Sequence, residues 1–231
     1  MLDGGSPRWR PLLVAVCAVA VLVAGCATRA PVVTAPSFPD FPFPTVPAEL
    51  AGSPAAREHE RGWALLQAGD LEGARRAFQA VLASSPGFHP ADAGVGYVGL
   101  AAGAVDEAVA GFDRALACSA AYVPALLGRG EALLRADRTD EAVQSFEAAL
   151  AADPTLTDLR PRVAELRFSS LMEQVAEARM AAEADRDEEA RAAYERVIRA
   201  SPESGFLYIE LAQIERRAGD RASALSRLEQ A

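Results

Sequence analysis

The sequence predicts an all-α chain in which pairs of antiparallel helices repeat and stack as an α-solenoid. Small residues and aromatic residues each recur at an interval of 34 positions. The repeated positions are Gly62, Gly96 and Gly130, and Phe78, Phe112 and Phe146. A constant interval of this length indicates a repeat architecture, in which each unit buries its apolar face against the next one.

Composition sets limits on the core and on the partners. The 231 residues carry a net charge of −9, and all 23 basic residues are Arg. This acidic balance argues against a nucleic-acid binder, because phosphate contacts need clustered basic side chains. Aromatic residues make up only 6 % of the chain, so we expect a core built mainly from Ala, Leu and Val.

The first 25 residues have the pattern of an export signal. Arg8 and Arg10 precede an uncharged, apolar run over residues 11–25. The run ends in Val23-Ala24-Gly25-Cys26, which resembles the lipobox of bacterial lipoproteins. The resemblance implies that residues 1–25 are removed and that Cys26 is acylated. A plain signal peptide and an uncleaved anchor are the alternatives.

Residues 26–54 are predicted to tether the domain to the membrane. Seven prolines fall between residues 28 and 54, and such a segment forms neither a helix nor a core strand. One interpretation is an extended spacer. The other gives Phe38, Phe41 and Phe43 a docking role, either on a partner or in the domain's own groove.

Residues 55–231 resemble the tetratricopeptide repeat (TPR) family, whose helix-turn-helix units form a right-handed superhelix. The second helix of each unit carries Ala74, Ala108 or Ala142 four residues before its Phe, and Pro86 and Pro154 end this helix in two of the units. The first predicted domain, 55–156, contains the three units 55–88, 89–122 and 123–156. The second, 157–231, contains two further units, 171–204 and 205–231. The last unit is incomplete.

A long helix is predicted over residues 161–184, joining the third unit to the fourth. Its small and apolar positions alternate at intervals of four and three, which is the period of a helical stripe. They are Ala164, Phe168, Leu171, Val175, Ala178 and Ala182.

The sequence predicts no catalytic site, no metal site and no cofactor site. The segment Gly94–Gly99 reads GVGYVG, but no strand precedes it, so it lacks the context of a dinucleotide site. His59 and His89 have no Cys or His at ligand spacing. Cys118 would be the single thiol left after processing, apart from Cys26, and a lone helical Cys is usually a small packed hydrophobe.

The TPR resemblance implies a partner-binding groove lined by the first helix of each unit. Its predicted residues are His59, Trp63, Gln67, Tyr97, Leu100, Leu127, Glu131 and Arg135. An extended or helical peptide would suit such a groove. The alternative is that Trp63 and Tyr97 only pack against neighbouring helices.

The predicted function is therefore a non-catalytic scaffold or adaptor in bacterial envelope assembly, bound to the membrane and to unidentified envelope proteins. Ala27 rather than Asp follows Cys26, which by resemblance to Gram-negative sorting favours the periplasmic face of the outer membrane. Alternatives are a regulator or presenter of a peptidoglycan hydrolase or protease, and a pilotin-like factor for secretin assembly.

Overall fold

The computed structural model describes residues 35–231, which form ten α-helices and one short 3-10 helix, with no β-strand among them. The 3-10 helix is η1 (Ala48–Leu50). The α-helices are α2 (Pro54–Gln67), α3 (Leu71–Ser84), α4 (His89–Ala102), α5 (Val105–Cys118), α6 (Val123–Arg135), α7 (Thr139–Ala152), α8 (Leu159–Glu183), α9 (Asp187–Ala200), α10 (Gly205–Arg217) and α11 (Arg221–Gln230). The predicted all-α solenoid is confirmed.

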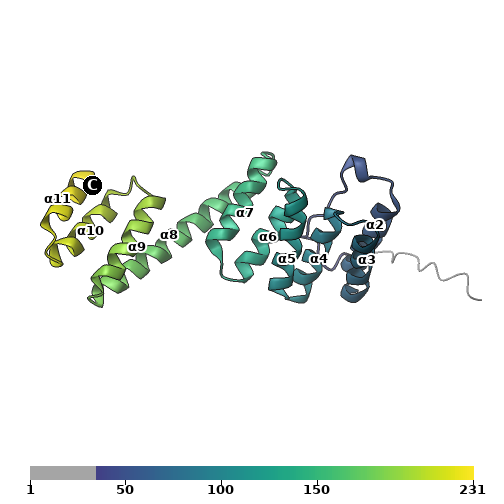
Figure 1. Ribbon diagram of the computed structural model, residues 1–231, viewed down its shortest axis with the longest axis horizontal. Coiled ribbons are helices and arrows are strands. Elements are labelled where there is room, and N and C mark those ends of the chain that lie inside the picture. The colour runs from purple at the N-terminus through teal and green to yellow at the C-terminus, as the bar shows by residue number, and fades with distance from the viewer. Residues whose placement is uncertain (1–34) are drawn as a thin grey trace, which may run out of the picture.

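The helices form two blocks. The first block comprises α2–α7, the second α9–α11, and α8 runs diagonally between them (Figure 1). The predicted signal peptide and the predicted acylation site, Cys26, lie outside the described residues. None of the helices between residues 35 and 231 has the length and apolar character that crossing a bilayer requires.

Local sequence explains where the helices begin. The Ser53 hydroxyl accepts the backbone N–H of Ala56 at 3.0 Å, and Pro54 occupies the first turn of α2. The Asp70 carboxylate accepts the N–H of Gly73 at 2.8 Å and so caps α3. Such caps satisfy N–H groups that have no partner inside the helix.

A left-handed residue separates the two helices of each unit. Gly69, Gly103 and Asp137 occupy this place in the first three units, and Asp185 and Gly219 in the last two. Their φ values lie between 56° and 89°, a region that glycine adopts without strain. The 34-residue interval therefore fixes the turns as well as the helices.

Glycines make room for the aromatic rings of the first block. The Phe112 ring is fully buried between Gly96 and Gly128. A Cβ atom at Gly96 would lie 2.7 Å from this ring, and one at Gly128 only 2.3 Å from it. Phe78 and Phe146 are enclosed in the same way, by Gly62 and Gly94 and by Gly130. The repeated Gly and Phe positions therefore pack against one another.

The predicted long helix is observed as α8, but its predicted stripe is wrong in the first half. Ala164 is exposed, and the Phe168 side chain is 65 % exposed. Val163 and Ser170 are buried there instead. The first half of α8 packs against α7 and the second half against α9. The buried residues of the two halves therefore do not form one continuous stripe.

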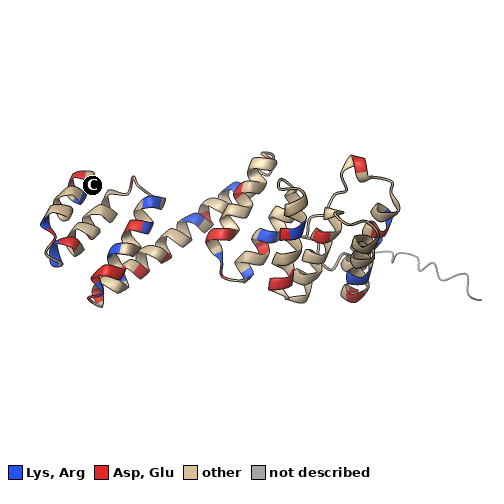
Figure 2. Cartoon of the chain, viewed as in Figure 1, with Lys and Arg blue, Asp and Glu red and all other residues tan. Residues whose placement is uncertain are grey.

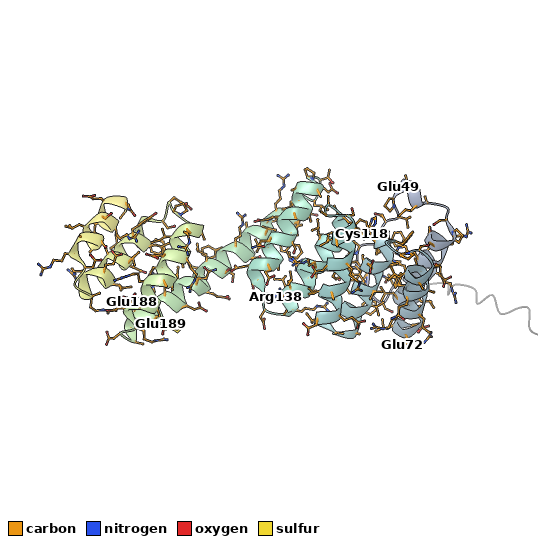
Figure 3. All side chains as sticks on the ribbon, viewed as in Figure 1. Glu49, Glu72, Cys118, Arg138, Glu188 and Glu189 are labelled. Atoms are coloured by element: carbon orange, nitrogen blue, oxygen red, sulfur yellow. The ribbon has the colours of Figure 1, made fainter. Side chains whose placement is uncertain are left out.

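Cys118 is exposed, so the expectation of a packed thiol is wrong. It is the last residue of α5, at the edge of the first block (Figure 3). Ala115, one turn earlier, is fully buried. The end of α5 therefore projects beyond the core, so the Cys118 side chain stays in solvent.

Candidate partner-binding groove

The first helices of the three front units, α2, α4 and α6, line the predicted groove. Trp63 on α2 and Tyr97 on α4 lie next to each other, with ring centroids 5.6 Å apart and planes at 85°. Their positions are 34 residues apart in the sequence, and stacking of the units brings them together. Tyr97 is 1 % exposed, whereas Trp63 is half-buried.

Part of the groove is filled by the chain's own N-terminal segment. We call residues 37–50 the strap. Four apolar strap side chains pack against the core that α2–α6 share. These are Phe38, Phe41, Val46 and Leu50. From residue 37 onward the proline-rich segment is therefore docked, which is the second of the two interpretations considered for it.

The strap begins at the C-terminal end of α2, where Gln67 holds it. The backbone N–H of Ser37 donates to the Gln67 carbonyl oxygen at 2.8 Å. The Gln67 side chain binds Phe38 twice: its Oε1 accepts the Phe38 N–H at 3.1 Å, and its Nε2 donates to the Phe38 carbonyl oxygen at 2.9 Å. This pairing fixes the register of the strap, because the side-chain amide satisfies both backbone groups of one residue.

Aromatic contacts hold the middle of the strap. The Phe41 ring lies 5.1 Å from the Tyr97 ring, and Phe38 stacks on Phe41 at 5.2 Å. Phe43 lies 5.6 Å from Trp63, edge to face, and 5.5 Å from the His59 ring. Centroid distances of this size are typical of favourable aromatic pairs.

Two side chains bind the far end of the strap. His59 Nε2 donates to the Pro44 carbonyl oxygen at 2.8 Å, and the Tyr122 hydroxyl donates to the Thr45 carbonyl oxygen at 2.8 Å. Burial lowers the pKa of His59 to about 4, so the ring is neutral near pH 7. A neutral ring with its proton on Nε2 matches the carbonyl, which only accepts.

Tyr97 supports the groove from below. Its hydroxyl donates to the Pro124 carbonyl oxygen at 2.6 Å, which links α4 to the start of α6. Burial raises the pKa of this hydroxyl well above its usual range. Tyr97 therefore both packs between helices and presents its ring to Phe41, so the two interpretations of this residue both apply.

The third unit keeps an open cleft of about 480 Å³ beside the strap. Leu127, Glu131 and Arg135 line it together with Phe41. The Glu131 carboxylate forms an ion pair with Arg162 from α8, and the Arg162 guanidinium lies 5.0 Å from the Phe146 ring centroid. Arg135 Nη1 donates to the carbonyl oxygen of Leu100 at 2.7 Å, and Leu100 itself is buried.

The structure thus divides the predicted groove residues into two sets. The set in contact with the strap is His59, Trp63, Gln67 and Tyr97. The set that lines the open cleft is Leu127, Glu131 and Arg135, with Leu100 behind Arg135, and Tyr97 belongs to both sets. No group of three His, Cys, Asp or Glu side chains suited to a metal ion occurs in residues 35–231.

Sequence reasoning missed two residues of this site. Tyr122 follows Phe88 by 34 positions, and both are buried aromatics directly before the first helix of a unit. That interval could have identified Tyr122. Arg162 had no such signal, because it lies in the insertion that interrupts the repeat.

Comparison with known families agrees with this geometry. A tetratricopeptide-repeat model matches residues 59–123 and 120–157, and a second one matches residues 174–204. Together these matches span more than half of the chain. The chain is a tetratricopeptide-repeat protein. No curated protein matches it. The TPR fold is typical of scaffolds for protein–protein interactions and of non-catalytic proteins.

Several solved structures share the fold. The TPR domain of P58(IPK) is 21 % identical with a TM-score of 0.50; the match covers 77 % of this chain and 50 % of that one. YrrB, described as a TPR protein with an unusual peptide-binding site, is 19 % identical with a TM-score of 0.43, covering 79 % and 87 %. A TPR protein from Parabacteroides merdae is 16 % identical with a TM-score of 0.45, covering 76 % and 78 %. The chain thus spans half the length of the P58(IPK) domain.

Proposed function

We propose that this TPR protein is a lipid-anchored, non-catalytic adaptor of the bacterial envelope that binds an extended partner segment in its concave groove. One observation carries the proposal: the groove already seats a peptide segment, the strap, through hydrogen bonds to its backbone and aromatic contacts to its side chains. The strap turns at Pro39–Asp40, where the Phe41 N–H donates to the Phe38 carbonyl oxygen at 3.3 Å, and has no regular secondary structure from residue 42 to residue 47. A surface that holds one such segment in this way has the features of a peptide-recognition site.

The open cleft of the third unit supports a role for α6 in the same recognition. Leu127 and Glu131 are only half-buried, whereas residues 90–100 of α4 are all buried beneath the strap and the neighbouring helices. A partner segment therefore has free access to an apolar side chain, a carboxylate and the Arg135 guanidinium next to the strap.

Site-specific photocrosslinking in membranes tests the adaptor role. A benzophenone side chain at position 127 is expected to capture a discrete partner, and the same group at position 168 is not. Phe168 is a matched control because it is aromatic and exposed and does not line the cleft. Equal capture from both positions would contradict binding in the groove.

The lipid anchor rests on the lipobox resemblance and needs its own test. We expect the intact mass of membrane-extracted protein to correspond to a chain that begins at Cys26 and carries acyl groups. Density-gradient fractionation should place this chain with the outer membrane. A Cys26→Ala chain cannot be acylated at this position and should lose the stable attachment that several acyl chains provide. If it stays equally membrane-bound, the lipid anchor is excluded.

A further inference from the structure

The strap is bound in the way that a foreign peptide would be bound. Three groove side chains donate to strap carbonyl oxygens: Gln67 to Phe38, His59 to Pro44 and Tyr122 to Thr45, at 2.9, 2.8 and 2.8 Å. These bonds recognise the main chain of the strap whatever its side chains are. Selectivity therefore comes from the rings that Tyr97 and Trp63 contact.

Prolines fit this arrangement. A proline has no N–H group, so it leaves no donor without a partner. Pro39, Pro42 and Pro44 alternate with the three phenylalanines of the strap. The main-chain N–H groups that bind the groove are those of Ser37 and Phe38, both at Gln67. An extended segment rich in proline also loses little conformational entropy on binding.

The strap is an addition to the helical framework. The helices of each unit pair with one another, and the strap joins α2 through an exposed turn at Gly52, which has a φ of 74°. The Phe43 side chain stays 37 % exposed, and Phe38 and Phe41 are half-buried. Release of the strap would therefore uncover a groove without breaking a helix pair.

We propose that the strap is an internal ligand, and that the groove's external partners are segments with the same pattern: aromatic side chains at positions i, i+3 and i+5, separated by prolines, with a turn between the first two aromatic residues. This inference rests on the proposed function, since it names the class of partner that the groove takes. Strap and partner compete for one surface, so the docked strap keeps the groove closed to weaker ligands.

The competition has a calculable size. A ligand tethered by a short flexible linker acts at an effective concentration of about 1 mM. A free peptide of identical sequence must overcome this concentration in the native chain but not in a chain whose strap cannot dock. The apparent affinity falls by the ratio of this concentration to the Kd of the open groove, so a peptide with a Kd of about 0.1 mM or tighter should bind at least about ten-fold more weakly to the native chain.

The probe is a fluorescein-labelled synthetic peptide with the sequence of residues 36–46, PSFPDFPFPTV, followed by fluorescence anisotropy. It is titrated into the full chain in detergent and into the same chain with Phe38→Ala, Phe41→Ala and Phe43→Ala together. A Phe168→Ala chain is the matched control, since it loses an aromatic ring away from the groove. The substituted strap should raise the affinity for the peptide at least about ten-fold, and the control should behave like the native chain.

Trp63 supplies an independent readout. In a chain with Trp9→Phe it is the single tryptophan. Loss of Phe43 from its edge should shift the emission of Trp63, and an excess of unlabelled peptide should restore the native spectrum. A peptide in which the three phenylalanines are replaced by Ala should not.

Three outcomes would overturn the inference. They are equal affinity for both chains, no binding to a substituted chain that keeps its helical circular-dichroism signal, and loss of that signal on substitution, which would make the strap part of the core. None depends on acylation or on capture of an envelope protein. A non-acylated chain would contradict the proposed function and leave the peptide result intact.

Discussion

The two blocks of the solenoid use the same helix pairing with different cores. In the first block, the Phe112 ring fits between glycines and meets the Tyr97 ring edge to face at 5.0 Å. In the second block, Tyr194 takes the aromatic position, and its hydroxyl donates to the Glu210 carboxylate at 2.9 Å. Burial, reinforced by this hydrogen bond, raises the pKa of Tyr194 to about 12. The aromatic position of the second unit is therefore filled by an apolar ring, whereas that of the fourth unit reaches a carboxylate.

The grooves of the two blocks also differ in polarity. Aromatic rings line the front groove, and the strap covers them. The second block has a smaller open hollow of about 280 Å³, lined by charged and polar side chains that include Arg179, Glu183 and Gln213. Figure 2 shows acidic and basic residues interspersed along its helices. An aromatic, proline-rich strap complements the first surface and not the second.

The largest effect should come from the first core. We expect Phe112→Ala to lower the free energy of unfolding by about 3–5 kcal/mol, because the ring is fully buried and glycines cannot fill the space that it leaves. Urea unfolding followed by circular dichroism measures this loss. Phe168→Ala is the control and should change the value by less than about 0.5 kcal/mol. Similar losses for both variants would mean that the observed packing of Phe112 is wrong.

Acid should weaken the first block selectively, because both histidines of the chain, His59 and His89, lie in it. Burial lowers the pKa of His59 to about 4 from an ordinary value of 6.5. Between these values the unfolded chain binds the proton and the folded chain does not, so stability falls as the pH drops through this range. The pKa of His89 is lowered too, also by burial.

We expect His59 to account for a loss of about 2 kcal/mol between pH 7.5 and pH 5. Urea unfolding followed by Trp63 fluorescence, in a chain with Trp9→Phe, measures it in the first block. A His59→Gln chain should lose most of this pH dependence. If it keeps the full dependence, the acid sensitivity has another source.

A smaller effect is expected from the charged edge of the second block. Glu215 is 2 % exposed, and Arg227 Nε lies 3.3 Å from its Oε1. Arg227→Ala would leave this carboxylate buried without its cation. We expect a loss of about 1–2 kcal/mol, in the lower part of the range for unsatisfied buried groups, because the Arg227 side chain is itself 27 % exposed.

Thermal unfolding by circular dichroism measures the Arg227→Ala effect, and Arg216→Ala is the control because Arg216 is exposed on α10. An unchanged midpoint for Arg227→Ala would contradict the role of Arg227 as the partner of the buried carboxylate.

The smallest effect should be at Cys118. Because its side chain is exposed at the end of α5, Cys118→Ser should change the free energy of unfolding by less than about 0.5 kcal/mol. Ala115→Leu, one turn earlier on the same helix, should cost about 1–3 kcal/mol, because Ala115 is fully buried. Urea unfolding compares the two. A Cys118→Ser loss as large as that of Ala115→Leu would contradict the exposed position.

The sequence by itself determined the helices, their turns and the cores of the repeats. The interval of 34 residues predicts which Gly faces which Phe, and it brings Trp63 and Tyr97 together. These relations follow from local periodicity, because each unit meets its neighbour through the same few positions. The long helix followed from periodicity too, within two residues at each end.

The tertiary structure decided three other points. The exposure of Phe168 and of Cys118 depends on whether a neighbouring helix covers them. The local sequence pattern does not show this. The state of the proline-rich segment was open as well, because an extended chain has no internal hydrogen bonds and can be a spacer or a ligand. Its docking required Gln67 and His59 of α2, and Tyr122 directly before α6, to point at its backbone. Only the stacked helices bring those donors to one surface.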